Sequence, residues 1–356
     1  MVQILKKWFD KYFSDPQAVV LFLALVLGFA IVIYMGGMLL PVLASLVIAY
    51  LLDDVVGFLE KKGVPRLRGV ILVFLVFIAL MVFVLFALIP MLSSQVTELM
   101  QQLPKMMNKG REALLKLPEH YPFISDQQVT NLIETILSEL SSVGHKVVSA
   151  SLSSLVSLIT LVVYLVLFPL LVFFFLKDKH LIIQWAKGFI PKEHNLIAQV
   201  WKAVDPQIGN YVQGKFWEML LVGLVSGVVF AILGLGYSIL LGALVGISVI
   251  VPYIGATVVT IPVVLIGFFQ WGWSVPFAYL VIAYAIIQAL DASVLVPLLF
   301  SEAVNLHPIA IIVAILFFGG IWGFWGVFFA IPLATLVQAI IHAWPRPEPE
   351  ADSIPS

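Results

Sequence analysis

The sequence predicts an all-α protein that lies in a membrane and crosses it about eight times. Some spans are expected to be discontinuous or re-entrant, and one helical insert to lie outside the membrane. Of the 356 residues, 62% are hydrophobic and only 11% are charged. Soluble proteins carry about 25% charged residues, and longer soluble chains divide into domains that each keep a charged surface. The shortage of charge indicates that much of the protein surface faces lipid.

The first apolar stretch predicts two membrane spans. It runs from Ala18 to Leu52, which is far longer than the apolar region of about 7–15 residues in a cleavable signal peptide. A helix needs about 20 apolar residues to cross ~30 Å of hydrocarbon. The stretch therefore holds two spans, with Gly36-Gly37 as the expected turn.

Further apolar runs predict the remaining spans. The third runs from Val70 to Ile89 and is expected to end at Pro90, and the fourth runs from Leu155 to Leu176. Lys177-Asp178-Lys179 stops the fourth span. From Trp217 to Trp344 the chain is apolar almost throughout, and turn signals divide it. These signals are Gly234-Leu-Gly236, Trp271-Gly272-Trp273 and the polar segment from Ser301 to Asn305.

Basic residues predict the orientation, because Lys and Arg are retained in short cytoplasmic loops. Three clusters precede the first span, follow the second and follow the fourth. They are Lys6, Lys7 and Lys11; Lys61, Lys62, Arg66 and Arg68; and Lys177, Lys179, Lys187, Lys192, Lys202 and Lys215. Four single crossings place all three on one side. We therefore expect a protein of the bacterial inner membrane with cytoplasmic N- and C-termini.

The same signals divide the chain into four regions. Residues 1–90 form a three-span membrane region, and residues 91–154 form a periplasmic helical insert. Residues 155–344 form a membrane core with a cytoplasmic segment at 177–216. Residues 345–356 are rich in proline and acidic, and are expected to be a disordered cytoplasmic tail.

The insert has apolar residues at helical spacing among charged ones. Ser125 followed by Gln128 is typical of a capping box. One apolar face comprises Val129, Leu132, Ile133, Ile136, Leu137 and Leu140. The insert is either a solvated helical hairpin that spaces two spans, or a cap or oligomer contact over the membrane core.

Asp291 is the strongest candidate functional residue. It lies within the apolar run from Val275 to Phe300, with Gln288 three residues and Tyr284 seven residues before it. These intervals put all three on one helical face. A carboxylate in hydrocarbon costs several kcal/mol unless it faces protein or water, so it is by default a functional candidate. The alternative is a hydrogen-bonded Asp that holds one helix to its neighbours. Pro297 could break this helix and bring water nearer.

Two other places predict interrupted helices. The first is Pro252-Tyr-Ile-Gly255, and the second contains Gly319, Gly320, Gly323 and Gly326 and is followed by Pro332. Irregular backbone at membrane depth survives only where protein buries it or it lines a cavity, and transporters coordinate substrates at such breaks. Close helix packing through small residues is the competing interpretation. It is preferred for the pairs Gly223/Gly227 and Gly242/Gly246.

The remaining signals narrow the function classes. The net charge of −1 gives no indication of nucleic acid, and zero cysteines exclude disulfides and thiolate metal sites. No phosphate-binding G-x-x-x-x-G-K-[ST] loop and no H-E-x-x-H zinc motif is present, so we expect no cofactor, no metal and no enzyme. Glu218, three residues after Lys215, predicts a local ion pair. His307-Pro308 predicts a helix start.

An ordered set of these residues resembles a known family. Phe175-Leu-Lys-Asp178 closes the fourth span, Pro252-Tyr-Ile-Gly255 breaks a later one, and Asp291, Pro297 and Leu306-His-Pro308 follow. Gly319-Gly-x-x-Gly323-x-x-Gly326 then leads to Ala330, Pro332 and Ala334. In order and spacing the chain resembles the autoinducer-2 exporter family of bacterial membrane proteins, over nearly its whole length. The resemblance implies about eight spans, a homo-oligomer, and export or exchange of small molecules.

The sequence thus predicts a secondary transporter that moves a small solute across the lipid bilayer without ATP, with export coupled to H⁺ or Na⁺. Asp291, assisted by Gln288 and Tyr284, would carry the coupling. A passive channel is one alternative. A membrane scaffold that binds partners through residues 91–154 is the other.

Overall fold

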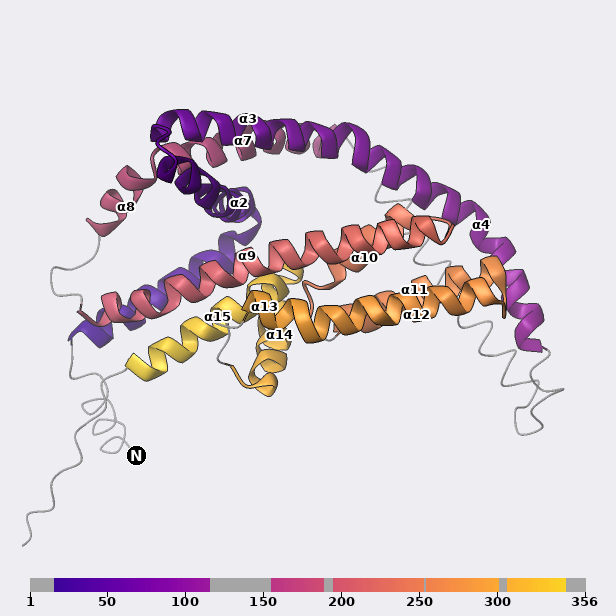
Figure 1. Cartoon of the computed structure of the whole chain (residues 1–356). Coiled ribbons are helices and arrows are strands. Elements are labelled where there is room, and N and C mark those ends of the chain that lie inside the picture. Colours follow the sequence, from indigo (N-terminus) through magenta and orange to yellow (C-terminus); the bar gives the residue numbers. More distant parts are fainter. Residues whose placement is uncertain (1–15, 116–154, 189–194, 253, 301–305, 344–356) are drawn as a thin grey trace, which may run out of the picture. The chain divides into compact units, whose positions relative to one another are not determined.

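The computed structural model describes residues 16–115, 155–188, 195–252, 254–300 and 306–343, and within these ranges the chain forms helices joined by turns (Figure 1). The all-α prediction is confirmed. The helices are α2 (Pro16–Lys61), α3 (Arg66–Phe83), α4 (Ile89–Leu115), α7 (Leu155–Lys177), α8 (Lys179–Lys187), α9 (Asn195–Ile232), α10 (Ser238–Ser248), α11 (Ile254–Trp271), α12 (Val275–Leu290), α13 (Val296–Phe300), α14 (Pro308–Trp322) and α15 (Phe324–Ala343), with five-residue π-helical turns at η1 (Val84–Leu88) and η2 (Asp291–Leu295).

The expected turn at Gly36-Gly37 is wrong. Helix α2 continues through both glycines for 46 residues. Glycine weakens a helix interior by only about 0.5–1 kcal/mol, and membrane helices contain more glycine than soluble ones, so two adjacent glycines do not end an apolar helix. The expected cytoplasmic location of the N-terminus depends on two crossings in this stretch. It stays a prediction.

The expected helix end at Pro90 is also wrong. Helices α3, η1 and α4 follow one another without a gap from Arg66 to Leu115. A proline inside an α-helix lacks an N–H donor and clashes with the carbonyl four residues before it. The π-turn η1 lies just before Pro90, and there the N–H of Ile89 bonds to the carbonyl of Val84, five residues back. The wider turn accommodates the proline, so the helix runs on into the insert.

The other turn signals correspond to observed turns. The chain turns at Gly234, with φ 73°, and again at Gly272, with φ 62°. Helix α7 ends at Lys177, as its basic stop signal predicts, and His307 caps α14 by accepting a bond from the N–H of Ile309 at 3.3 Å. The expected break from Ser301 to Asn305, the capping box at Ser125 and the apolar face at 129–140 lie outside the described residues.

The chain forms two compact units, and each draws on several separate stretches of sequence. Unit 1 comprises Met1–Val70, Leu170–Phe216 and Val296–Ser356, and unit 2 comprises Ile71–Pro169 and Trp217–Leu295. These units are groups of residues in contact, whereas the four consecutive regions expected from the sequence are defined by where they lie relative to the membrane. They stay a prediction.

Unit 1 is built around the hairpin of α14 and α15. Its core contains Tyr211 of α9 together with Ile315, Phe318 and Ala330 of the hairpin, and Phe29 of α2 packs against it. At the Lys61 end of α2, Asp53 accepts ion pairs from Arg66 at 3.0 Å and from Lys179 at 2.6 Å. Arg66 also donates to the carbonyl of Leu176 at 3.0 Å. One residue from each of two basic clusters therefore contacts the same carboxylate, and the cytoplasmic side of these clusters stays a prediction.

Unit 2 is a bundle of the second half of α9 with α10, α11 and α12, and α4 packs against α10 and α11. Helices α9 and α10 meet through the two glycine pairs, and the Cα of Gly227 lies 2.6 Å from where a Cβ on Gly242 would be. The preferred packing interpretation of these glycines is confirmed. In the same unit, α3 and α7 lie side by side, with the rings of Phe77 and Phe168 6.2 Å apart (Figure 1).

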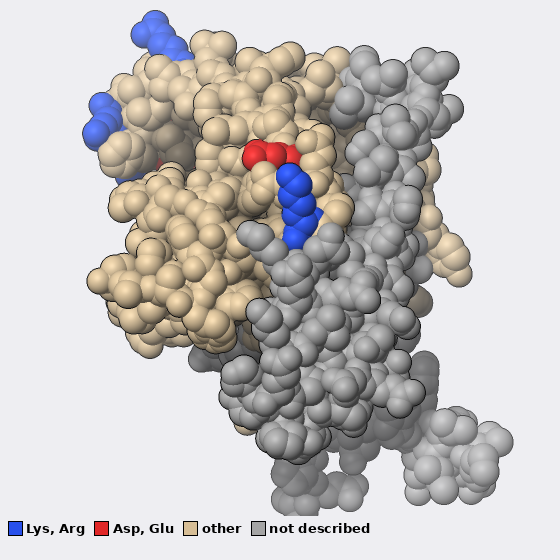
Figure 2. Space-filling view, turned by 90° about the vertical axis from the view of Figure 1, so that its right-hand side faces the viewer, with Lys and Arg blue, Asp and Glu red and all other residues tan. Residues whose placement is uncertain are grey.

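Among the described residues, six helices are long and apolar enough to cross a membrane, and three shorter apolar helices accompany them. Figure 2 shows that the described surface on one side of the molecule carries very few charged side chains. Large apolar side chains are exposed over these helices, for example Leu75, Val228 and Leu316. Such a surface suits lipid and not water, and the protein is a polytopic membrane protein.

Candidate functional site

The face of α12 with Tyr284, Gln288 and Asp291 packs into unit 2. Tyr284 is 4% exposed and belongs to the core of the unit, and its ring lies 5.9 Å from that of Phe230 on α9. Its hydroxyl lies 3.3 Å from that of Thr260 on α11, which is also 2.7 Å from the carbonyl of Ala256. Gln288 and Asp291 follow on the same side and are partly buried.

The predicted break at Pro252 and Gly255 is present and forms the tip of a hairpin. Helix α10 ends at Ser248 and α11 begins at Ile254. Gly255 is buried against the end of α10, because a Cβ there would overlap the carbonyl oxygen of Ser248. With only 11 residues, α10 rises about 16 Å, roughly half of a ~30 Å hydrocarbon layer. Helix α11, in contrast, is one of the six helices long enough to cross a membrane, so the hairpin joins a short helix to a long one.

Asp291 lies level with this tip. Helices α11 and α12 are antiparallel, and Tyr284 faces Thr260. Asp291 is seven residues beyond Tyr284, about 10 Å further along the axis. Because α11 is antiparallel to α12, the same distance along α11 leads seven residues back from Thr260, to the break between Pro252 and Gly255. The structure therefore brings the acidic side chain and its polar neighbours, which are close in sequence, to an interrupted helix of unit 2 that is distant from them in sequence.

The backbone at Asp291 departs from the α-helix. The π-turn η2 begins at this residue, and the N–H of Asp291 approaches the carbonyls of both Ile287 and Gln288. Pro297 is the second residue of α13 and follows the π-turn, as Pro90 follows η1. The helix therefore widens at Asp291, and does not break at Pro297 as expected. Single π-turns in helices are often found at functional sites.

The remaining break residues lie in unit 1, at the hairpin of α14 and α15. Gly323 forms its turn with φ 59°, and a Cβ on Gly326 would overlap the carbonyl oxygen of Phe318. A Cβ on Gly319 would lie 2.8 Å from Val327, whereas one on Gly320 would meet nothing within 4 Å. Pro332 is buried inside α15, which continues past it to Ala343. Pro332 is thus not a helix end.

Two charged residues on α9 are buried more deeply than the sequence indicates. Lys215 is 5% exposed and Glu218 is 3% exposed, and they are three residues apart on one helix. The ammonium of Lys215 lies 5.2 Å from the centre of the Phe300 ring. Their spacing predicted only a local pair at a span boundary, because burial depends on neighbours that the local sequence does not reveal. Burial makes charge costly, so both join Asp291 as candidates.

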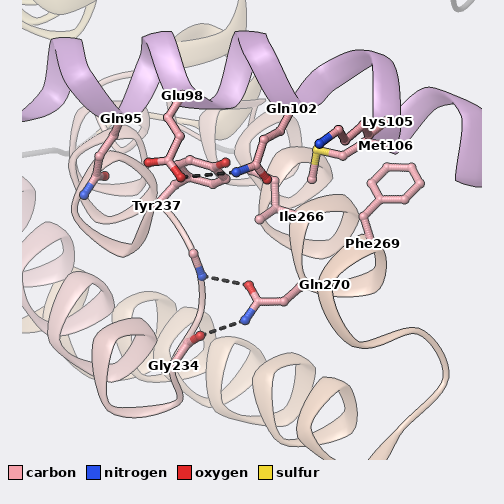
Figure 3. Close-up of a pocket in the computed structure, with 11 residues that line it drawn as sticks. Gln95, Glu98, Gln102, Lys105, Met106, Gly234, Tyr237, Ile266, Phe269 and Gln270 are labelled. Atoms are coloured by element: carbon pink, nitrogen blue, oxygen red, sulfur yellow. Dashed lines mark hydrogen bonds between the residues drawn. The ribbon is translucent and has the colours of Figure 1, made fainter.

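A cleft of about 500 Å³ with both polar and apolar lining lies elsewhere in unit 2, between α4 and the turns that end α9 and α11 (Figure 3). Side chains of α4 form one wall, and Gln270 with the turn at Gly234 forms the other. Its lining comprises Gln95, Glu98, Gln102, Lys105, Met106, Gly234, Gly236, Tyr237, Ile266, Phe269 and Gln270. Among the described residues, no three His, Cys, Asp or Glu side chains gather closely enough to hold a metal ion.

Comparison with known proteins identifies the family. The family described as "AI-2E family transporter" matches residues 20–346. The chain is 46% identical to "Putative permease PerM" of Escherichia coli K12, over 97% of this chain and 98% of that protein. It is 27% identical to "Putative transport protein YueF" of Bacillus subtilis 168, over 86% of this chain and 84% of the relative.

The chain belongs to the AI-2E family of transporters. The expected resemblance is therefore confirmed over nearly the whole length. A third relative, "Putative transport protein" of Thermotoga maritima, is 25% identical over 85% of this chain and 86% of its own length. These names describe transport proteins or a permease, and none of the three describes an enzyme.

Proposed function

We propose that this protein is a secondary transporter of the bacterial inner membrane, which exports a small solute without ATP and couples its movement to H⁺ or Na⁺ at Asp291. The observation that supports this most is the position of Asp291, at a π-turn level with the tip of the α10–α11 hairpin. Acidic side chains inside membrane proteins commonly mark ion and proton pathways, and interrupted helices there commonly line them.

Coupling would follow from the cost of charge at this depth. An ionised Asp291 requires water or a cation beside it, so it favours an arrangement in which the tip at Pro252 and Gly255 admits them. A protonated or cation-paired Asp291 tolerates a closed tip. Binding and release of the ion would thereby shift the population between two arrangements of the hairpin, because a ligand shifts a conformational equilibrium only through its differential affinity.

The protein's orientation in this proposal follows from the basic clusters that unit 1 brings together. The ends of α2 and α7 would be cytoplasmic, and so would the C-terminal tail. From Arg66 the continuous helix through α3 and α4 extends 41 residues to Met106, about 60 Å, so this part of α4 would lie on the periplasmic side. The chain has no cysteine. Single cysteines introduced at Lys105 and Ser356 should therefore react with a membrane-impermeant maleimide from opposite sides of the membrane.

Proteoliposomes with imposed H⁺ or Na⁺ gradients test the function itself. We expect saturable, gradient-driven flux of a small polar solute in wild type and its loss in Asp291→Asn, with Asp178→Asn as a control that removes an acidic group from the partly exposed end of α7. Normal transport by Asp291→Asn across the full pH range would reject the coupling role. Flux without saturation or gradient dependence would indicate a passive channel. No flux in correctly inserted protein would favour a scaffold.

A further inference from the structure

In the cleft between α4 and the turns of unit 2, hydrogen bonds fix the wall formed by Gln270 and the turn at Gly234. The side chain of Gln270 donates to the carbonyl of Gly234 and accepts from the N–H of Gly236, both at 2.8 Å. Opposite it, Gln95 of α4 accepts a bond from the N–H of Leu240 at 2.9 Å, in the first turn of α10. These bonds join three elements that are distant in sequence, so the cleft is built by tertiary contacts and does not depend on one loop.

Tyr237 lines the cleft and has an unfavourable backbone conformation. It has φ 60° and ψ 28°, the left-handed region that residues other than glycine seldom adopt. Such strain costs of order 1–3 kcal/mol and concentrates at functional sites. Burial, and to a smaller extent the charge of Glu98, raises the pKa of Tyr237. Its hydroxyl therefore stays protonated and available as a hydrogen-bond donor.

The wall formed by α4 carries two opposite charges with an amide between them. Glu98 and Lys105 are seven residues apart on one helix, so both lie on the same face, about 10 Å apart along the axis. Gln102 lies between them and donates to Glu98 at 3.2 Å (Figure 3). Met106 and Phe269 add apolar surface. Residues seven apart are not neighbours on a helix, so the two charges remain available to a ligand.

We propose that this cleft binds short zwitterionic peptides of two or three residues, with the ammonium end at Glu98, the carboxylate end at Lys105 and the peptide amides at Gln102 and Gln270. Three extended residues span about 10 Å, which matches the spacing of the two charges. A neutral polyol would use the amides but would leave both charges without partners. The biological use of the cleft, as the outer recognition site of the transport route, rests on the proposed function.

Binding to purified protein tests this directly. Wild-type protein in phosphatidylcholine nanodiscs is titrated calorimetrically with trialanine, with trialanine acetylated at its N-terminus, with trialanine amidated at its C-terminus, and with mannitol. We expect saturable binding of trialanine, and binding about tenfold or more weaker for each blocked peptide, because a charge-assisted hydrogen bond is lost. Mannitol should not compete.

Two variants make the test specific for the residues. Glu98→Gln should weaken trialanine as much as acetylation does and should have no further effect on the acetylated peptide. Lys105→Met should behave in the same way toward the amidated peptide. Both side chains are exposed, so folding should be unaffected, and a single peak in size-exclusion chromatography checks this. Asp178→Asn, between α7 and α8, and Lys187→Met, at the end of α8, change similar charges away from the cleft and should bind as wild type does.

The outcomes separate this inference from the proposed function. No saturable trialanine binding, or equal effects of all four variants, would overturn the peptide site. Binding of mannitol in competition with trialanine would also contradict it, because the charges would then not determine the ligand. Asp291→Asn should retain trialanine binding. If Asp291→Asn binds trialanine while neither this variant nor wild type shows solute flux, the peptide site is supported and the transport proposal is rejected.

Discussion

Two helical hairpins in the described part of the chain share one construction but differ in what surrounds them. In α10–α11 of unit 2 and in α14–α15 of unit 1, a glycine early in the second helix lies against a carbonyl near the end of the first: Gly255 against Ser248, and Gly326 against Phe318. The tip of α10–α11 lies level with an acidic residue and a π-turn. Helix α14 instead packs against aromatic rings, with Phe29 stacked 6.3 Å from Phe318 and 6.1 Å from Trp322.

The difference suggests that close glycine packing is a general device here and not itself a mark of function. The sequence presents both places alike, as glycines and prolines in an apolar run. What distinguishes them is the polar group at the same depth, which only the tertiary arrangement brings there. Function would then depend on the hairpin of unit 2, while the hairpin of unit 1 anchors α2 and α9.

Gly255→Ala and Gly326→Ala should have the largest effects on stability, and similar ones. Each Cβ would overlap a backbone carbonyl that cannot rotate away, so the cost should exceed the about 1–3 kcal/mol of ordinary overpacking. We expect a much lower melting temperature in detergent and little monodisperse protein. Gly320→Ala is the matched control, because its Cβ would meet nothing within 4 Å. Equal stability of all three variants would show that the hairpins are not packed as described.

Gly323→Ala should come next and should affect only the hairpin of unit 1. Its φ of 59° and ψ of −132° form a conformation that alanine adopts only with strain, at a cost of order 1–3 kcal/mol. The turn of α10–α11 does not depend on a single glycine of this kind, since it is formed by several residues around Pro252. A melting temperature lowered by several degrees, with residual flux per folded molecule unchanged, is the expected result. Loss of flux in the folded variant would give the second hairpin a role in transport as well.

The sequence could predict the local features of both hairpins but not their surroundings. Glycine at a turn, as at Gly234 and Gly272, and glycine pairs at helix contacts are readable because they act over a few residues. Pro90 does not end the helix as its sequence predicts, because a π-turn beside it accommodates the ring. The cleft was not predictable, since Gln95 meets Leu240 across 145 residues of sequence. The burial of Lys215 and Glu218 depends in the same way on distant neighbours.

Two buried tyrosines, one beside each hairpin, allow a second comparison of the two hairpins. Tyr284 approaches the hydroxyl of Thr260 on α11, and Tyr211 donates to the carbonyl of Phe328 on α15, each at 3.3 Å. Both are buried, so Tyr284→Phe and Tyr211→Phe should each cost about 0.5–1.5 kcal/mol in unfolding free energy. We expect only Tyr284→Phe to change the pH dependence or the rate of flux, because it lies two turns from Asp291. If Tyr211→Phe altered flux equally, the contrast between the hairpins would not hold.

The smallest effect should come from the ion pairs at the Lys61 end of α2. Lys179 pairs with Asp53 at 2.6 Å, but its side chain is 41% exposed and Asp53 keeps Arg66 as a second partner. Exposed pairs contribute about 0–1 kcal/mol, so Lys179→Met should lower the melting temperature only slightly. The difference in melting temperature from wild type should vanish at about 1 M salt, where the Debye length falls to ~3 Å.

Gln270→Leu in unit 2, which removes two uncharged hydrogen bonds, is the control. It should lower the melting temperature by an amount that salt leaves unchanged. A salt-sensitive Gln270→Leu or a salt-insensitive Lys179→Met would contradict the ionic character of the contact at Asp53 and the uncharged character of the contacts of Gln270.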